Sequence, residues 1–388
     1  MPTKPKKPAK KAPPAPKAAK PIVPLTPAAE KTRASISKLA SQVVTQINQA
    51  KNPTLMVPSR SLANAYFDPK KRIIQLGKET TARSFFNASM AKKFMQTFLV
   101  ADACRELIES MKTTSIRDLY YMTKHSLGET KINTFDDQEE SDPIIEDLEV
   151  TMMALREELH LAASKRGSMV GPITIRDRGD DIDLRRMGSG GWAIPSIVEP
   201  DVVQFLKTEA KYVLLIEKDA VWSRFNEDRF WQRDKCIIIQ GQGQPPRGVR
   251  RLVQRLNQEL KLPVYVLVDN DPWGFYIYSV VKQGSINLAY ESMRMAVPDA
   301  RFIGLSSFDA QKYGIPDNIS IKMTDEDVAR AKQMLTYDWF QEVRWKREIN
   351  EMVSTGRKYE IEALSRRGIS FITEEYLPRK LRDRDWLE

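Results

Sequence analysis

Three short, continuous apolar runs in the second half of the chain constrain its fold more than any other feature. They are KYVLLIE (211–217), KCIIIQ (235–240) and LPVYVLVD (262–269), and stretches with helical character separate them. Continuous Val, Ile and Leu runs that alternate with helices are typical of a parallel sheet covered on both faces. We therefore predict an α/β domain here, with a largely helical, charged C-terminal part.

The sequence before this domain predicts mostly helices. Periodic apolar residues predict helices over 28–50, 82–111 and 142–165, the last beginning after Ser141 as its N-cap. Ser115 followed by Asp118 fits a capping box, so we expect a further helix to begin there. A strand-like run then occupies GPITIRD (171–177). Closely spaced helices followed by short strands are typical of a helix-turn-helix or winged-helix module.

Composition limits the class of protein. The chain has 388 residues, enough for two or three domains, and it contains only two cysteines and two histidines, which excludes a disulfide framework, a zinc ribbon and a histidine-rich metal site. No apolar run is long enough to span a bilayer and the start of the chain has no apolar signal core, so we expect a soluble, unexported, cytoplasmic protein.

The net charge of +10 belongs mostly to one end of the chain. Residues 1–24 hold seven lysines and no acid, which leaves +3 for the remainder. We predict that the Lys/Pro/Ala-rich segment 1–27 is a disordered tail, because such a composition cannot bury apolar surface. Whether the tail contacts DNA or only aids solubility stays open.

Acidic residues follow two of the three apolar runs. Glu217 ends the first run, a Gly-rich turn (241–243) follows the second, and Asp269 and Asp271 end the third. Ligands gather at the carboxyl ends of parallel strands, and residues two apart in an extended chain point the same way. Three carboxylates without histidine or thiol suit a hard cation that keeps its waters, and Mg²⁺ is the natural choice.

A purely structural interpretation of these acids also exists. Asp271 precedes Pro272, and Asp followed by Pro is a common helix start, while Glu217 could simply complement the start of the following helix. The order of the three features at successive strand ends favours the metal site.

The sequence TTSIRDLYYMTKHS (113–126) contains two adjacent tyrosines. Neighbours on a helix lie about 100° apart, so the two rings belong to different faces. Tyr120 shares a face with apolar residues and is predicted to pack inside. Tyr121 shares a face with Arg117, Lys124 and His125, and nearby positive charge would favour a phenolate and hold a phosphate beside it. The alternative is an ordinary surface tyrosine beneath an arginine.

A nucleophilic tyrosine and a separate carboxylate cluster are together the parts needed to cut DNA by transesterification. At these residues the sequence resembles a known family. The blocks IRDLYYMTKH, LLIEKDAVWSRF, IIIQGQGQPPRGVRRLV and VLVDNDPWGFYIY, in this order, resemble the A subunit of archaeal DNA topoisomerase VI, which is related to the meiotic double-strand-break transesterase. The resemblance covers nearly all of the chain after the tail.

The resemblance implies a multidomain α/β protein. It implies a winged-helix (CAP-like) domain over 81–184 that carries the catalytic tyrosine, a linker over 185–205, and a Toprim domain of Rossmann-like topology over 206–388. The segment 28–80 is expected to contact a partner. The implied catalytic tyrosine is Tyr121, with Arg117 four residues before it, and the implied Mg²⁺ ligands are Glu217, Asp269 and Asp271.

The resemblance also implies partners. Two A subunits, each cutting one strand of double-stranded DNA, would form a homodimer within an A₂B₂ heterotetramer. The B subunit would be the GHKL-type ATPase that binds and hydrolyses ATP. No membrane is involved. Each active site would combine Tyr121 of one A chain with the carboxylates of the other. The chain itself has no GxxxxGK motif, in agreement with ATP use elsewhere.

Basic residues near these parts are candidates for contact with DNA. Arg247, Arg250 and Arg251 open the helix that follows the Gly-rich turn, and Lys124 lies near Tyr121. Backbone N–H groups and guanidinium groups at a helix start can both bind phosphate, although a solvated helix face would look the same. From its helical position, His125 is a candidate for the general base that would take the proton from the tyrosine.

Three other functions compete with this one. A Toprim nuclease or primase would use the carboxylates without a tyrosine. A DNA-binding architectural protein would use neither for chemistry. A phosphoryl-transfer signalling domain would also hold Mg²⁺ at acidic strand ends, but it would leave the tail and the tyrosine helix unexplained.

Overall fold

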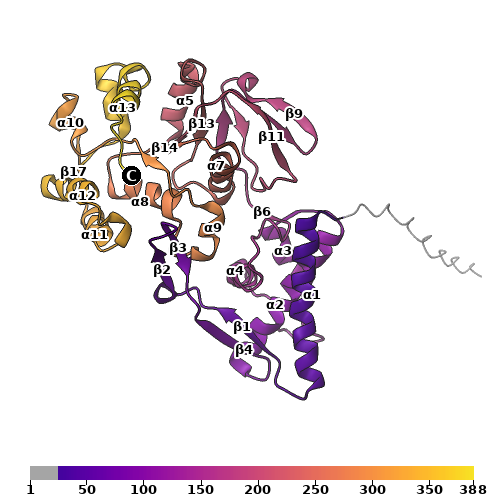
Figure 1. Ribbon diagram of the computed structural model, residues 1–388. Coiled ribbons are helices and arrows are strands. Elements are labelled where there is room, and N and C mark those ends of the chain that lie inside the picture. Colours follow the sequence, from indigo (N-terminus) through magenta and orange to yellow (C-terminus); the bar gives the residue numbers. More distant parts are fainter. Residues whose placement is uncertain (1–24) are drawn as a thin grey trace, which may run out of the picture.

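The computed structural model describes residues 25–388, which form two lobes (Figure 1). The tail prediction concerns residues 1–27, of which 1–24 lie outside the described residues. Within the described part, no helix combines the length and the apolar character that crossing a bilayer requires.

The first lobe is mainly helical and is built around α1, α2, α3 and α4. Its core contains Val100 and Cys104 of α2, Leu119 of α3 and Leu148 of α4, all of them fully buried. The elements of this lobe are α1 (Pro27–Asn48), β1 (Thr54–Pro58), β4 (Thr80–Ser84), α2 (Ala88–Glu109), β5 (Thr114–Ser115), α3 (Ile116–Thr123), α4 (Ser141–Met152) and β6 (Leu161–Ala162). Between β1 and β4, the hairpin of β2 (Ala65–Asp68) and β3 (Ile73–Leu76) extends to the second lobe, where Phe67 packs on Trp339. β1 pairs with β4, β2 with β3, and β5 with β6.

Two helix predictions in this lobe are wrong at their ends. The predicted helix 82–111 begins only at Ala88, because residues 80–84 form strand β4 and Asn87 caps α2. The predicted helix 142–165 ends at Met152, because Met153 adopts a left-handed conformation with φ of 51°. Ser141 is the first residue of α4 rather than its N-cap, which is Glu140.

The second lobe contains a six-stranded sheet in the order β10-β7-β13-β12-β14-β15. The predicted parallel core is confirmed, since β12 pairs in parallel with both β13 and β14, and β14 pairs in parallel with β15. The strands of the two larger sheets in this lobe are β7 (Ser168–Val170), β8 (Ile173–Asp177), β9 (Asp180–Asp183), β10 (Trp192–Ala193), β11 (Val203–Thr208), β12 (Tyr212–Ile216), β13 (Cys236–Gln240), β14 (Val264–Leu267) and β15 (Arg301–Phe302).

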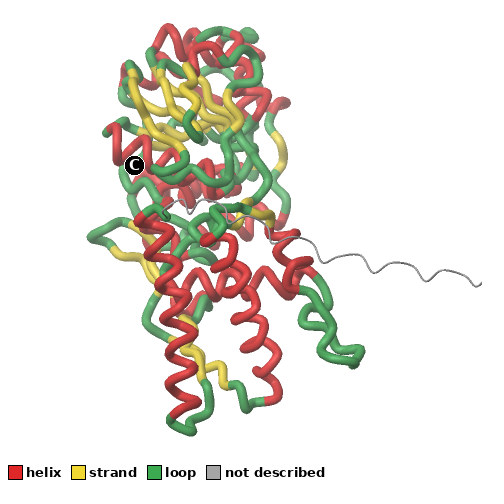
Figure 2. The backbone as a smooth tube through the Cα atoms, turned by 90° about the vertical axis from the view of Figure 1, so that its right-hand side faces the viewer, coloured by secondary structure: helices red, strands yellow, loops and turns green. Residues whose placement is uncertain are grey.

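Two features of this lobe were not expected. β7 and β10, which precede residue 206 in the chain, extend the large sheet as antiparallel strands. The predicted strand 171–177 is confirmed as β8, but it belongs to a separate antiparallel sheet of order β11-β8-β9. Figure 2 shows the large group of strands in the upper part of the molecule, and the long helices below with a few short strands beside them.

Helices cover both faces of the large sheet, as the continuous apolar runs predicted. Side chains of β12 alternate between two cores: Val213 and Leu215 pack with residues of α7 and α8, whereas Leu214 and Ile216 pack with residues of α5 and α6. The helices and remaining strands of this lobe are α5 (Asp219–Glu227), α6 (Phe230–Asp234), α7 (Arg247–Leu260), α8 (Pro272–Gln283), α9 (Ser292–Met295), α10 (Asp309–Lys312), β16 (Ile321–Lys322), α11 (Asp325–Met334), α12 (Val343–Thr355), β17 (Arg357–Lys358) and α13 (Leu377–Asp383).

Candidate active site

The tyrosine helix α3 is short and firmly placed. The hydroxyl of Ser115 accepts a hydrogen bond from the N–H of Asp118 (3.0 Å), so Ser115 is confirmed as the N-cap. The capping box is not complete, because the Asp118 carboxylate accepts from the Ser115 hydroxyl (2.8 Å) rather than from the Ser115 N–H. Just before the helix, Thr114 and Ser115 of β5 pair with Leu161 and Ala162 of β6. An eight-residue helix is too short to be stable alone, so these contacts fix its position.

The two tyrosines of α3 have opposite environments, as predicted. Tyr120 is only 7% exposed, and its hydroxyl donates to the backbone carbonyl of Asp136 (3.2 Å). Tyr121 is 63% exposed. The hydroxyl of Tyr121 is therefore open to an incoming phosphate, whereas that of Tyr120 is used inside the protein.

The cations near the tyrosines are placed differently from one another. Arg117 is exposed, and within residues 25–388 its side chain makes no hydrogen bond or ion pair. Lys124 instead donates through Nζ to the hydroxyl of Tyr120 (2.6 Å) and to the carbonyl of Asp136 (2.9 Å). Lys124 thus supports the buried tyrosine, although its helical spacing suggested Tyr121. His125 is exposed and follows the end of α3.

The three predicted metal ligands lie at the carboxyl ends of adjacent strands. Glu217 follows β12, and Asp269 and Asp271 follow β14. A carboxylate oxygen of Glu217 accepts a hydrogen bond from the N–H of Asp269 (3.3 Å), which brings the two strand ends together. The Gly-rich turn (241–243) lies next to the end of β12, since the N–H of Gly243 donates to the carbonyl of Glu217 (3.0 Å).

Burial and mutual repulsion perturb these carboxyl groups. Burial, with a further contribution from the charge of Asp269, raises the pKa of Glu217 to about 7. Burial likewise raises the pKa of Asp269 to about 6, although the N–H of Ile361 and the ammonium of Lys218 oppose the rise. The pKa of Asp271 is also raised, again mainly by burial. Carboxylates held together against repulsion in this way favour a bound cation.

The three carboxylates are suitable ligands for Mg²⁺, but several of their oxygens already accept hydrogen bonds or form ion pairs within the protein. Asp269 accepts from the N–H of Ile361 (2.8 Å) and pairs with Nζ of Lys218 (2.9 Å), and Asp271 caps α8 by accepting from the N–H of Gly274 (2.6 Å). Among residues 25–388, no three Asp, Glu, His or Cys side chains converge closely enough to ligate one ion as they lie. Carboxylate oxygens without nitrogen or sulfur ligands are the donors that a hard cation such as Mg²⁺ prefers.

Two parts of this site were missed from the sequence. Lys218 bridges Asp269 and Glu362, both at 2.9 Å. Lys218 directly follows Glu217, so its position could have been noticed. The backbone of Ile361 comes from the C-terminal part of the chain, where no sequence pattern marked it.

The predicted DNA-contacting arginines are not on the surface. Arg247 and Arg250 are buried and pair with carboxylates, and the partly buried Arg251 pairs with Glu199 (2.7 Å). The expectation that these guanidinium groups meet phosphate is therefore corrected for this structure. Their helix start is covered by other parts of the protein.

The tyrosine and the carboxylates belong to different lobes of one chain. Figure 1 shows α3 beside α1 and α4 in the lower lobe, whereas β14 and α8 lie in the upper lobe. The tyrosine helix and the carboxylate cluster are each held in place by their own lobe, but the fold of one chain does not bring the tyrosine next to the carboxylates.

Comparison with known families connects these parts. The type IIB DNA topoisomerase family matches residues 92–161, and the Toprim domain of the topoisomerase 6 A subunit and Spo11 matches residues 212–381. The all-beta domain of the DNA topoisomerase VI alpha subunit matches residues 165–209. The A subunit of type 2 DNA topoisomerase 6 from Hyperthermus butylicus is 42% identical over 377 residues, which cover 93% of this chain and 97% of that protein.

The chain belongs to the topoisomerase VI A-subunit family. The corresponding protein of Pyrococcus horikoshii is 40% identical (91% of this chain, 94% of that protein), and the DNA topoisomerase 6 A subunit of Arabidopsis thaliana is 36% identical (92% and 81%). The resemblance inferred from four short blocks is thus confirmed over the whole folded chain. As an A subunit of a type IIB topoisomerase, the chain is a DNA-cleaving enzyme, and the upper lobe contains its Toprim domain.

Proposed function

We propose that Tyr121 is the nucleophile with which this protein cuts one DNA strand. The observation that carries the proposal is the contrast between the exposed hydroxyl of Tyr121 and the buried, bonded hydroxyl of Tyr120. The oxygen of Tyr121 attacks the scissile phosphorus and loses its proton, while the bond from phosphorus to one deoxyribose oxygen breaks and that oxygen leaves as a hydroxyl. The phosphotyrosine bond keeps the energy needed for resealing.

Arg117 is proposed to assist this step. Its exposed guanidinium lies one helical turn before Tyr121 on α3. There it can hold the phosphate next to the phenol and favour the ionised form of the nucleophile. Arg117 is better suited to this role than Lys124, whose ammonium is bonded to Tyr120.

Glu217, Asp269 and Asp271 are proposed to hold Mg²⁺. The three carboxyl groups lie at neighbouring strand ends, and burial, with a smaller contribution from the neighbouring acids, raises the pKa of Glu217 and of Asp269. The ion, when bound, supplies positive charge to the phosphate and to the leaving oxygen. Glu217 and Asp269 provide oxygens from neighbouring strands, and Asp271 keeps its position by capping α8.

We further propose the finer domain assignment. The helices α2, α3 and α4, which share one core, suit a winged-helix (CAP-like) domain in the range 81–184, followed by a linker in 185–205 and the Toprim domain over 206–388. The strands β7, β8, β9 and β10 also fall before residue 206, but they lie in the sheets of the second lobe. The segment 28–80 is proposed to contact a partner. The names of the relatives imply a double-stranded DNA substrate and a B subunit, and we propose that ATP is bound by this B-type partner within an A₂B₂ assembly.

The separate lobes favour an active site shared between two copies of this chain. Mixed dimers test this arrangement. Tyr121→Phe and Asp269→Asn dimers should each be inactive, but a dimer with one chain of each kind would retain one complete site if tyrosine and carboxylates come from different chains. Such a mixed dimer is expected to nick one strand. Complete inactivity of the mixed dimer would indicate that each chain uses its own carboxylates.

The proposed reaction is tested by quenching a cleavage mixture with denaturant. The mixture contains the chain, a B-type partner, circular DNA, Mg²⁺ and ATP, and the product is expected to be DNA that stays bound to protein after denaturation. Free linear DNA with no attached protein would instead identify a Toprim nuclease, and the tyrosine proposal would be wrong.

A further inference from the structure

A buried group of charged residues joins the two lobes. It consists of two arginines from α7 and three carboxylates from other parts of the chain, and we call it the interlobe cluster: Arg247, Arg250, Glu149, Glu157 and Glu291. Every one of these side chains is at least nine-tenths buried. Glu149 lies on α4 in the first lobe, whereas Arg247 and Arg250 lie on α7 in the second.

Arg247 is the centre of the cluster. Its Nη2 lies 2.5 Å from Oε1 of Glu149 and 3.2 Å from Oε2 of Glu157, and its Nε lies 2.9 Å from Oε2 of Glu291. Nη2 of Arg250 lies 2.9 Å from the other oxygen of Glu291. One planar guanidinium thus contacts carboxylates from three separate segments. The two hydrogen bonds from Arg247 to Glu149 are directional and hold α4 to α7. The contacts with Glu157 and Glu291 are ion pairs only, because Nε of Arg247 and the facing oxygens of these two carboxylates make no hydrogen bond.

A second, partly exposed layer of ion pairs joins the same parts. Nη1 of Arg294, on α9, lies 2.5 Å from Glu158, and its Nη2 lies 3.3 Å from Glu199. Glu199 also pairs with Arg251 of α7. Displacing the lobes would therefore separate several pairs at once, and those in the interior would be left as buried, uncompensated charges.

A short structural path leads from the cluster to the nucleophile. Glu157 and Glu158 are followed after two residues by β6, and Leu161 of β6 pairs with Thr114 of β5, directly before the tyrosine helix. The N–H of Thr114 also donates to the carbonyl of His160 (3.1 Å). The carboxylates that Arg247 and Arg294 hold are therefore on the segment against which the start of α3 is aligned.

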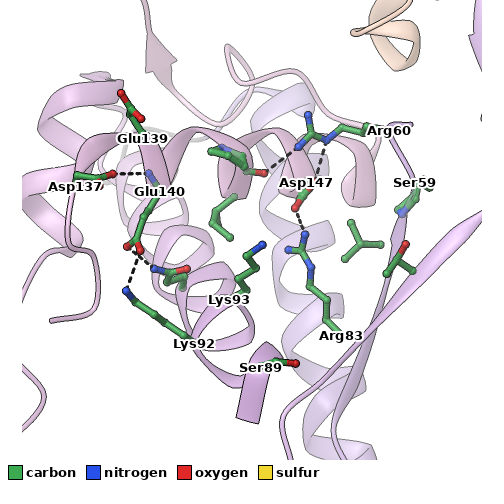
Figure 3. A pocket seen from close by; sticks show the side chains of 16 residues that line it. Ser59, Arg60, Arg83, Ser89, Lys92, Lys93, Asp137, Glu139, Glu140 and Asp147 are labelled. Carbon is green, nitrogen blue, oxygen red and sulfur yellow. Dashed lines mark hydrogen bonds and ion pairs between the residues drawn. The ribbon is translucent and has the colours of Figure 1, made fainter. Parts of the chain in front are cut away.

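The helix that carries Glu149 is also held on its other side. Asp147 of α4 accepts from Arg60 and from Arg83, which lie on the N-terminal segment around β1 and β4 (Figure 3). Figure 3 shows these side chains directed toward α4 at the edge of a polar cavity. α4 is thus fixed by ion pairs toward both its neighbours and cannot turn independently of them.

We propose that the interlobe cluster positions Tyr121 by holding the tyrosine-bearing lobe in one orientation on the Toprim lobe of the same chain. This inference rests on the proposed role of Tyr121. Arg247 and Arg294 act here as positioning residues, through β6 and β5, and touch neither DNA nor metal.

The distance between the lobes of one chain provides the test. Glu106 on α2 and Lys346 on α12 are exposed and can be replaced by cysteine, whereas Cys104 and Cys236 are fully buried and should escape labelling. Spin labels at the two new cysteines, in complexes diluted with unlabelled chains, report the distance within one chain by pulsed electron resonance. The distribution is expected to be narrow and to stay unchanged when DNA, Mg²⁺, ATP and the B-type partner are added. A broad distribution, or one that shifts during the reaction, would overturn the proposal.

Variants then link the cluster to the chemistry. Arg247→Met is expected to broaden the distance distribution and to slow formation of the protein–DNA adduct about a hundredfold, the effect of misplacing a reacting group by about an ångström, with DNA affinity unchanged. Arg247→Lys, which keeps the charge but loses the planar guanidinium that bonds Glu149 through two nitrogens, should restore only part of both. Arg176→Met, which breaks an exposed pair with Asp181, is the matched control and should change neither.

A second variant at the edge of the cluster covers the case in which Arg247→Met does not fold. If Arg247→Met does not fold, Arg294→Met, at a partly exposed position, replaces it with the same expectation. A variant that folds and slows the adduct without broadening the distribution would contradict the positioning role. If the adduct forms on a residue other than Tyr121, the proposed function fails, but the distance measurements still show whether the lobes are locked.

Discussion

The rings of Tyr120 and Tyr121 lie edge to face, 5.1 Å apart, yet only one of them is exposed to solvent. The hydroxyl of Tyr120 donates to the carbonyl of Asp136 and accepts from the ammonium of Lys124. Tyr121 is exposed beside it, on the face that also carries Arg117. One tyrosine therefore supports the helix from inside while the other is available for chemistry.

Removing each tyrosine hydroxyl separates these roles. Tyr121→Phe is expected to abolish DNA cleavage while leaving DNA affinity and stability largely unchanged, because it removes only an exposed oxygen. Tyr120→Phe should stay active and lose about 1–3 kcal/mol of unfolding free energy, because it removes two hydrogen bonds that each typically contribute about 0.5–1.5 kcal/mol. Cleavage gels and thermal unfolding measure both. An active Tyr121→Phe enzyme would contradict the assignment.

The carboxylate site predicts a dependence on divalent cations. Asp269→Asn and Glu217→Gln should each weaken Mg²⁺ binding, measured by calorimetry, and abolish cleavage, because each removes a negatively charged ligand from a small cluster. Chelation of Mg²⁺ should stop cleavage by the unaltered enzyme reversibly. Asp385→Asn, which removes an acid that pairs with Lys312, is a suitable control. Equal Mg²⁺ affinity in the control and in Asp269→Asn would exclude the proposed site.

The buried arginines predict a loss of stability rather than of DNA binding. Arg247→Met leaves Glu149, Glu157 and Glu291 without their main partner, and breaking a buried ion pair typically costs about 3–5 kcal/mol. Denaturant unfolding should show this loss, whereas the salt dependence of DNA binding should be unchanged. A reduced salt dependence in a folded Arg247→Met protein would instead support a phosphate contact.

Replacing the exposed Arg117 on the tyrosine helix is expected to weaken DNA binding without lowering stability. Arg117→Gln should leave unfolding unchanged, because the side chain has no ion pair or hydrogen bond within the described residues. It should slow cleavage and reduce the magnitude of the slope of log affinity against log salt by about 1, as expected for one lost phosphate contact. Arg105→Gln, on the neighbouring helix, loses only local pairs with Asp102 and Glu109 and provides the comparison.

The parts of the fold that the sequence predicted well are those in which a local pattern has one physical meaning. The strands β12, β13 and β14 are continuous apolar runs, which only a doubly covered sheet explains, and the acids that follow them necessarily lie at one edge. Ser115 formed the expected N-cap for the same reason, since its hydroxyl satisfies a free N–H group of the helix start.

The failures occurred where distant residues decide the outcome. A helix start rich in arginine has the same sequence whether it meets phosphate, water or carboxylates. The main partner of Arg247, Glu149, is 98 residues away in sequence, and that of Arg250, Glu291, is 41 residues away. The strands β7 and β10 have only three and two residues, too few for any periodicity. Beyond α4, the spacing of Leu155 and Leu159 imitates a helix although Met153 has already ended it.

The most direct test of the central claim is to identify the amino acid that is attached to DNA. Cleavage in the presence of Mg²⁺, ATP and a B-type partner would be stopped with denaturant, the DNA-linked protein digested with protease, and the remaining peptide sequenced by mass spectrometry. We expect the residues 113–126 with the nucleotide on Tyr121. Attachment at Tyr120 or elsewhere, or cleaved DNA without any peptide, would contradict the account.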